Sequence, residues 1–215
     1  MFILYAVVIG VAIGFLVGGR LDGLARIDFR WPWIAITGFF VQVLLFSESV
    51  GAAVGAAGPP IYVASTLAVL VAVIHNVRIP GLAIVAFGAA SNLIAIVANG
   101  GFMPASPGAF AALDRGLNEG YTNSSIVESP AFQPLTDVYA MPAWVPLANV
   151  FSIGDVLIAT GVVLVLVLGM RSGRNAAAVT PQPLHVAPVV PSPPPAAESP
   201  SVLPAEASPD PARAP

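Results

Sequence analysis

The chain has 215 residues, of which 57% are hydrophobic and 9% are charged, and its mean hydropathy is +0.87. A soluble domain carries about 25% charged residues, so this composition indicates an integral membrane protein. The formal net charge is -3, all eight basic residues are arginines, and cysteine is absent. These absences exclude a Walker lysine, a Schiff base, a thiol nucleophile, a disulfide and a cysteine zinc site. The arginines are too scattered for a nucleic-acid interface, and we expect no cofactor and no bound metal.

The first predicted element is a membrane span at residues 2–19, which is uncharged up to Arg20. It is just long enough to cross about 30 Å of hydrocarbon at 1.5 Å per residue. A secretory signal peptide carries its positive charge before the apolar run, so we expect this span to be retained. Gly10, Gly14 and Gly18 recur every four residues, a spacing that lets another backbone approach closely. We favour a helix of the same bundle as the partner over a second copy of the chain.

Three further spans are predicted, at residues 31–47, 61–75 and 80–98. The first of them opens with an interfacial tryptophan pair, Trp31 and Trp33, around a proline suited to the first turn of a helix. The Gly-rich stretch 51–60 is predicted to be a turn. His75 is interpreted as a polar helix end, because no second metal ligand lies near it in the sequence.

Polar side chains within these spans must avoid lipid. Gln42, Ser91 and Asn92 carry groups that hydrocarbon cannot satisfy, so we expect them to point inward and to form interhelical hydrogen bonds. A transport pathway is the alternative. It is disfavoured because no ionisable residue lies deep within a span.

The fourth span ends in a break at Asn99-Gly100-Gly101, where a glycine can adopt the left-handed cap conformation and Pro104 cannot continue the helix. The break opens an external segment, 99–152. We expect a short amphipathic helix on the membrane surface within it, starting at Ser106-Pro107, with one apolar face formed by Phe110, Leu113 and Leu117.

The fifth span is predicted at residues 153–170. Asp155 follows Ser152 by three residues, the spacing of a capping box, so its carboxylate is expected to complement the N–H groups that start this helix. Asn99 is expected at the same membrane surface. We therefore hypothesise that Asn99 donates a hydrogen bond to Asp155 within one polar rim.

The arginines predict the orientation, because basic residues near span ends are held on the cytoplasmic side. With the N-terminus outside, only Arg115 falls outside, and six arginines fall inside: Arg20, Arg26, Arg30, Arg78, Arg171 and Arg174. The sequence thus divides into a transmembrane domain, 1–172, and a cytoplasmic tail, 173–215. The tail is rich in proline and alanine without apolar periodicity, so we expect it to be disordered.

Two blocks, Asn92 to Ala105 (NLIAIVANGGFMPA) and Pro146 to Gly161 (PLANVFSIGDVLIATG), resemble a family of bacterial multi-spanning membrane proteins known only as a domain of unknown function. The resemblance covers residues 1–172. Its most specific strings are Asn-Gly-Gly-x-Met-Pro, starting at Asn99, and Asn-x-Phe-Ser-Ile-Gly-Asp, starting at Asn149. The resemblance implies a membrane protein and brings no activity.

A more distant similarity is to the lipoprotein signal peptidases, which are four-span aspartyl proteases with Asn-x-x-Asp-Arg and Phe-Asn-x-Ala-Asp motifs. The matching strings here start at Asn92 and at Phe151, and Asp155 occupies the place of the second motif's aspartate. Ala95 stands where the first motif has aspartate. An aspartyl protease needs two carboxylates that share a proton, so the dyad is incomplete unless Glu48 or Asp137 supplies the second.

Three functions remain open from the sequence. The preferred hypothesis is a five-span, all-α protein of the bacterial inner membrane, non-enzymatic, whose external segment binds a lipid or a protein partner. The second is a diverged aspartyl hydrolase that uses Asp155, and the third is a small permease that acts as a homo-oligomer. A second carboxylate beside Asp155 would favour the hydrolase. A continuous polar cavity lined by Gln42, Ser91 and Asn92 would favour the permease.

Overall fold

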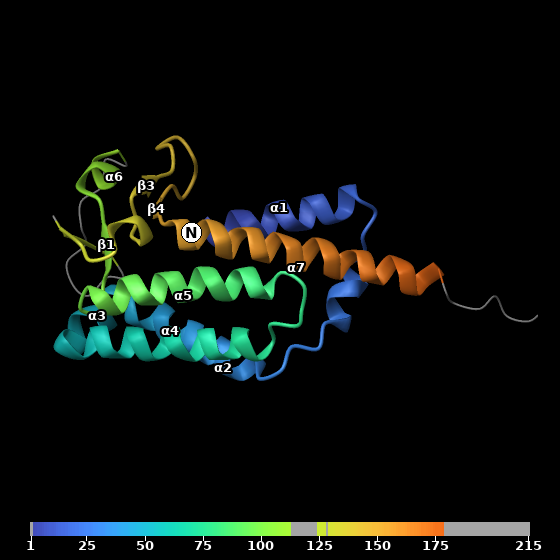
Figure 1. Ribbon diagram of the computed structural model, residues 1–215, viewed down its shortest axis with the longest axis horizontal. Coiled ribbons are helices and arrows are strands. Elements are labelled where there is room, and N and C mark those ends of the chain that lie inside the picture. The colour runs from blue at the N-terminus through green and yellow to red at the C-terminus, as the bar shows by residue number, and fades with distance from the viewer. Residues whose placement is uncertain (1, 113–123, 128, 179–215) are drawn as a thin grey trace, which may run out of the picture. The chain divides into compact units, whose positions relative to one another are not determined.

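A computed structural model describes residues 2–112, 124–127 and 129–178, and this part of the chain is mostly helical (Figure 1). The five longest helices are α1 (Phe2–Leu16), α2 (Pro32–Leu45), α4 (Gly58–His75), α5 (Leu82–Ala98) and α7 (Ile153–Ala178). The shorter helices are η1 (Leu21–Arg26), α3 (Glu48–Val54), η2 (Gly55–Ala57), α6 (Pro107–Ala111) and η3 (Gln133–Leu135). The strands are β1 (Met103–Ala105), β2 (Ser124–Ile126), β3 (Tyr139–Ala140) and β4 (Val150–Phe151).

Two helical stretches are long and apolar enough to cross a membrane, Ser49–His75 and Ile153–Ser172, with mean hydropathies of 1.9 and 2.4. Three shorter apolar helices accompany them, namely α1, α2 and α5. These three have 15, 14 and 17 residues, fewer than the approximately 20 of a typical span. Among the described residues, two helical stretches therefore meet the length and composition of a membrane span.

The end of α1 corrects the prediction for Gly18. The helix stops at Leu16, before the predicted end of the span at residue 19, because Gly18 adopts a φ of 75°. Its N–H donates to the carbonyl of Phe15, and the Gly19 N–H donates to that of Gly14, the pair of bonds that defines a Schellman cap. Gly18 is therefore a helix terminator and not part of the packing stripe.

The stretch 51–60, predicted to be a turn, is largely helical. It forms the end of α3, then η2 and the first turn of α4, and only Gly55 has a positive φ, of 49°. Alanines between its glycines favour helix, and Pro59 and Pro60 lie in the first turn of α4, where the missing N–H leaves no helical bond unmade. α4 therefore begins before the predicted start of the span at residue 61.

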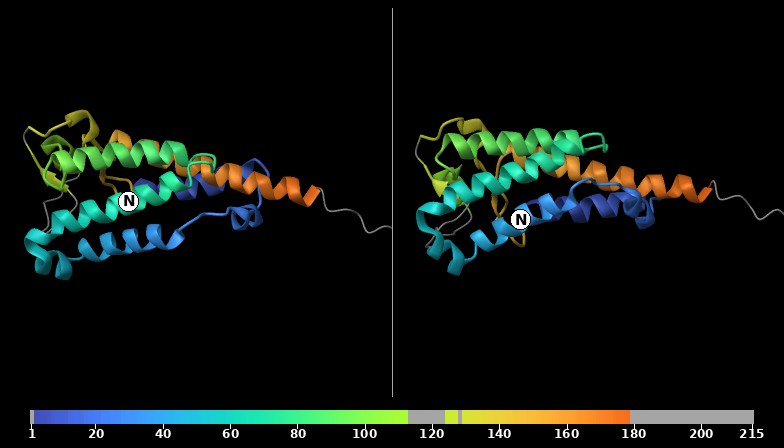
Figure 2. Two further views of the ribbon diagram at one scale, coloured as in Figure 1. Left: turned by 60° about the horizontal axis from the view of Figure 1, so that its bottom comes forward. Right: turned by 90° about the horizontal axis from the view of Figure 1, so that it is seen from below.

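The long helices pack in the order α2, α4, α5, α7, α1, each against its neighbours in that series. The loops 17–31 and 76–81 lie toward the end at which α7 finishes, and the described residues of segment 99–152 lie at the opposite end (Figures 1 and 2). We call these the arginine end and the cap end, and we call residues 99–152 the cap segment. The arginines whose side chains the structure describes all belong to the loops 17–31 and 76–81 or to the last turns of α7: Arg20, Arg26, Arg30, Arg78 and Arg171.

Hydrogen bonds tie the loops of the arginine end to the helices. The side chain of Asn76, which caps α4, accepts from the backbone N–H of Arg30 at 2.7 Å and donates to its carbonyl at 2.6 Å. His75 stacks on Trp31 with ring centroids 3.9 Å apart, so it packs against the start of α2 as well as ending α4. The N–H of Arg20 donates to the carbonyl of Met170 in α7, at 2.9 Å.

Glycines set the closest helix contacts, and those of the α1 stripe face α7. A Cβ at Gly10 would lie 2.8 Å from Leu166 Cδ1, and a Cβ at Gly14 would lie 2.3 Å from Met170 Sδ. Gly19 continues this contact in place of Gly18, because a Cβ at Gly19 would lie 2.7 Å from Met170 Cβ. The stripe thus packs within the chain, against the longest helix of the bundle.

The cap segment contains two small sheets. β1 pairs in parallel with β2, and β3 pairs antiparallel with β4. The backbone of Asp137 bonds to β1 on both sides, donating to the Pro104 carbonyl and accepting from the Ser106 N–H. Tyr139 and Phe2 each stack on Phe151, which fastens the second sheet to the start of α1.

The structure changes the predicted extent of two helices, the surface helix and the fifth span. The predicted surface helix is only five residues long where it is described, in α6, and Leu113 and Leu117 lie outside the described residues. α7 continues to Ala178, beyond the predicted end of the span at residue 170, because the following residues include good helix formers. The rest of the predicted tail lies outside the described residues.

Candidate functional site

The most connected polar cluster in the described chain joins α5 to the start of α7. Asn92 Nδ2 donates to Asp155 Oδ1 at 2.9 Å, and the Ser152 N–H donates to Asp155 Oδ2 at 3.0 Å. In return, Ser152 Oγ accepts from the Asp155 N–H at 3.1 Å and donates to Asn92 Oδ1 at 2.9 Å. We call these three residues the Asn92–Ser152–Asp155 cluster.

Local sequence explains the α7 half of this cluster. Ser152 and Asp155 bond reciprocally, side chain to backbone, as in a capping box, with aspartate in the place that glutamate usually takes. The Asp155 carboxylate also lies in the first turn of α7, at the positive end of the helix dipole. Ser152 is fully buried and Asp155 is half-buried.

The hypothesised bond between Asn99 and Asp155 is wrong. Asn99 Nδ2 donates to the carbonyl of Ala95 at 2.7 Å and to that of Ala131 at 2.9 Å, and Asn99 Oδ1 accepts from the Ala131 N–H at 2.9 Å. Asn99 thus uses both amide donors on backbone carbonyls. It fastens the cap segment to the end of α5, and Asn92 takes the position at Asp155 that Asn99 was expected to fill.

The other residues of the two sequence motifs each make separate contacts. Gly100 and Gly101 have φ values of 75° and 90°, and the Gly101 N–H donates to the Ile96 carbonyl, which closes α5 with a Schellman cap. A Cβ at Gly101 would lie 2.5 Å from Pro59 Cβ, so the break also packs on the start of α4. Pro104 is fully buried in β1, and the carbonyl of Asn149 accepts from the Met141 N–H.

The hydrogen bonds of the cluster connect α5 to the start of α7. Each Asp155 oxygen accepts from a neutral donor, one an amide side chain and the other a backbone N–H. An aspartyl dyad requires a carboxyl group as partner. None of the groups that hydrogen-bond to Asp155 in the described chain is a carboxyl group, and Ala95, fully buried in α5, supplies no acid.

The polar residues of the other spans lie apart. Gln42 Nε2 donates to Thr66 Oγ1 at 3.2 Å, which is an interhelical bond between α2 and α4. The hydroxyl of Ser91 is buried in α5 without a hydrogen-bond partner among the described residues. Neither residue shares a hydrogen bond with the Asn92–Ser152–Asp155 cluster.

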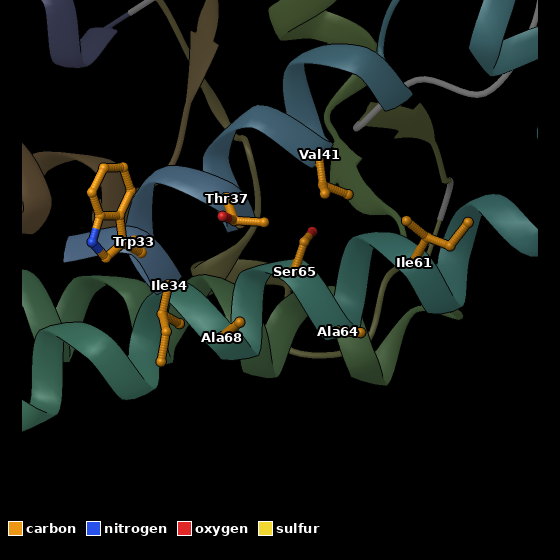
Figure 3. A pocket seen from close by; sticks show the side chains of 9 residues that line it. Trp33, Ile34, Thr37, Val41, Ile61, Ala64, Ser65 and Ala68 are labelled. Carbon is orange, nitrogen blue, oxygen red and sulfur yellow. The ribbon is translucent and has the colours of Figure 1, made fainter. Parts of the chain in front are cut away.

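Two apolar grooves of about 510 Å³ each run along the helices. The first lies between α2 and α4, where Trp33, Ile34 and Val41 face Ile61, Ala64 and Ala68 across the groove (Figure 3). The second lies between α1 and α7 under Met141. Gln42, Ser91 and Asn92 line neither groove, so these cavities are not the continuous polar cavity that a permease would require.

Sequence reasoning missed the glycines that bring α5 and α7 together. A Cβ at Gly88 would lie 2.4 Å from the Gly154 carbonyl, and a Cβ at Gly81 would lie 2.6 Å from the Gly161 carbonyl. A Cβ at Gly154 would lie only 1.9 Å from Asn92 Oδ1. The signal was present in the sequence, because Gly81 and Gly88 are seven residues apart, as are Gly154 and Gly161, and seven residues correspond to two helical turns along one face.

Comparison with known proteins gives a family and no activity. The sequence model of a family of unknown function, DUF5317, matches residues 26–167. No curated protein and no solved structure matches the chain. Within the described residues, no three histidine or acidic side chains lie close enough to hold a metal ion.

Proposed function

We propose that this chain, which belongs to the family of unknown function DUF5317, is a multi-pass protein of the bacterial inner membrane. From its geometry, we propose that it binds a lipid or protein partner through an external cap. In this proposal α1, α2, α4, α5 and α7 are five spans. The N-terminus and the cap segment lie outside, and the arginine end and the tail lie inside.

One observation carries the proposal: the five long helices run alternately in opposite directions, with the described arginines at one end and the cap segment at the other (Figures 1 and 2). Basic residues at a single end are what the positive-inside rule requires of a membrane bundle. The cap segment contributes no described arginine side chain to this pattern.

Exposed apolar side chains support the membrane placement. On α1, α2 and α5, Leu16, Phe39 and Phe87 are 85%, 64% and 75% exposed. Burying one such side chain gives about 1.5 to 3 kcal/mol, so exposure of many of them to water is costly. Hydrocarbon removes that cost, and the shorter helices fit a bilayer that thins locally.

The cap segment exposes apolar residues in strained conformations, which supports a binding role. Phe132 and Leu147 have φ values of 52° and 57°, in the left-handed region that costs a bulky residue about 1 to 2 kcal/mol. Both are about half exposed, and Trp144, in the same loop as Leu147, is 84% exposed. Strained backbone of this kind is concentrated at functional sites in proteins, and an exposed tryptophan suits a membrane interface or a protein partner.

The cluster at Asp155 supports a non-enzymatic role over the hydrolase. Asn92 and Asp155 are the positions that match the two signal-peptidase motifs, and they meet directly. Their contact is a capping and interhelical arrangement, in which Asn92 and Ser152 each donate to one oxygen of the carboxylate. The proposal therefore assigns Asp155 to the stability of the bundle.

Photo-crosslinking in living cells tests the binding role. A benzoylphenylalanine at Trp144 is expected to give a discrete adduct whose mass distinguishes a lipid from a protein. The control position is Ala112, which is exposed in the same segment but carries a small side chain. Absence of an adduct at Trp144, or the same adducts at both positions, would contradict a binding surface at Trp144.

A further inference from the structure

A cavity of about 320 Å³ lies at the arginine end, away from the cluster at Asp155. Three segments form it: η1 with the residues that follow, the turn between α4 and α5, and the last turns of α7 within the apolar stretch. Its polar lining comes from Arg26, Asp28, Arg78 and Ser172. Two loops far apart in the sequence thus each contribute one arginine to the same cavity.

The two arginines that line this cavity are not neutralised by ion pairs with described residues. Arg20 pairs with Asp22 at 3.3 Å nearby, whereas Arg26 and Arg78 form no ion pair or side-chain hydrogen bond with any residue that the structure describes. Asp28 offsets one of the two charges, so the lining keeps a formal charge of about +1. An anion would be attracted to this cavity.

The remaining lining is apolar. Ile27 and Pro80 come from the loops, and Val165 and Leu168 come from α7. Ile27 also packs tightly on α7, because a Cβ at Gly169 would lie 2.8 Å from Ile27 Cδ1. A soluble anion gains nothing from such walls, whereas an amphiphile with an anionic head and an alkyl chain gains from both parts of the lining.

We propose that this cavity binds the phosphate of an anionic phospholipid between Arg26 and Arg78, with the start of an acyl chain against Ile27 and Leu168. The inference rests on the proposed membrane placement, which puts the cavity at the cytoplasmic surface. Basic pockets between helices on that side suit anionic headgroups. The bound lipid joins the loop after α1 to the turn between α4 and α5.

Lipid titration of the purified full chain tests this inference. The chain in detergent is titrated with phosphatidylglycerol or with phosphatidylcholine of the same acyl chains, and bound lipid is counted by native mass spectrometry. We expect phosphatidylglycerol to bind about fivefold more tightly, the ratio that ~1 kcal/mol for one net basic residue produces. Inorganic phosphate at the same concentration is expected not to displace it.

Matched variants locate the site. Arg26→Gln with Arg78→Gln is expected to remove the preference for phosphatidylglycerol. Arg171→Gln, which removes one positive charge at the same end of the bundle but outside the cavity lining, is expected to retain it. If the double variant does not fold, Arg78→Gln alone is compared with Arg171→Gln, with at least half of the preference lost as the expected result.

Three results would overturn the inference. They are equal binding of the two lipids by the wild-type chain, displacement by inorganic phosphate, and an equal loss of preference in Arg171→Gln. If the chain requires detergent to stay in solution but gives any of these results, the membrane proposal still holds. A chain that stays soluble and monodisperse without detergent overturns the membrane proposal itself.

Discussion

Asp155 accepts two hydrogen bonds that come from different parts of the fold, one within its own helix start and one from α5. Hydrogen bonds to a charged group contribute about 1.5 to 3 kcal/mol when water is excluded, against about 1 kcal/mol for neutral pairs. Asn92 also accepts from Ser152, so loss of any one member leaves a polar group of the other two unsatisfied. The three side chains should therefore behave as one energetic unit.

A double-mutant cycle measures this coupling. Asn92→Ala and Asp155→Ala are each expected to destabilise the bundle by about 1 to 3 kcal/mol, and together to cost less than their sum by about 1 kcal/mol or more. The free energy of unfolding in detergent is the quantity to measure. Additive losses would show that the bond does not contribute as described.

Asn99 provides the matched control for that cycle. It is the same residue type, seven residues later at the C-cap of α5, but its amide bonds to Ala95 and Ala131. Asn99→Ala combined with Asp155→Ala is expected to be additive within about 0.5 kcal/mol, because the two side chains share no partner. A hydrolase that uses Asp155 makes a different prediction, in which Asp155→Asn leaves stability unchanged but abolishes a cellular activity.

The sequence predicted the capping pair correctly but its third member wrongly, as Asn99 in place of Asn92. Ser152 and Asp155 form a local pattern with a fixed spacing, which any single sequence reveals. Asn92 and Asn99 are seven residues apart, two helical turns on one face and roughly 10 Å along the axis. Which of them contacts Asp155 depends on the position of α5 along the axis of α7, and no local sequence pattern determines that position.

At the level of elements, pairs of glycines determine the position of α5 along α7. Gly88 lies against Gly154 and Gly81 against Gly161, in an antiparallel crossing where the backbones approach closely. Where lipid surrounds the helices, such packing replaces the hydrophobic drive that water supplies. The Gly88–Gly154 contact places Asn92, one turn after Gly88, beside Asp155, the residue that follows Gly154.

Gly154→Ala tests the role of this contact. Its Cβ would lie 1.9 Å from Asn92 Oδ1 and 2.8 Å from the Gly88 carbonyl, so α5 must shift or the cluster must break. A loss of about 1 to 3 kcal/mol in the free energy of unfolding is expected, as for overpacked cores. Gly108→Ala in α6 is the control, because its Cβ would meet only Ser106 Oγ, at 3.7 Å, and it should change stability by less than about 0.5 kcal/mol. Equal effects of the two substitutions would contradict the account of the crossing.

Element ends were less predictable than elements. All five long helices overlap the apolar runs that predict them, because long uncharged stretches leave few alternatives. Gly18 and Gly55, in contrast, end helices through positive φ values that the spacing of glycines did not distinguish from packing or from a turn. A glycine serves close packing and helix termination equally well, and only its neighbours in space decide which.

For the whole molecule, the central claim is that one end of the bundle faces the cytoplasm and the cap segment faces outward. The apolar runs and the arginines predict this arrangement, and it stays a prediction. The order α2, α4, α5, α7, α1 was not predictable, since five spans in alternating directions can pack in many orders. α1 joins last in that series, fastened to α7 by Gly10 and Gly14.

Cysteine labelling measures that claim most directly, because the native chain has no cysteine. Ala25→Cys in η1 and Ala143→Cys in the cap segment are matched, exposed positions at opposite ends of the bundle. In intact spheroplasts, a membrane-impermeant maleimide is expected to label Ala143→Cys and to spare Ala25→Cys until the membrane is permeabilised. Labelling of Ala25→Cys with protection of Ala143→Cys, or equal labelling of both before permeabilisation, would contradict the account.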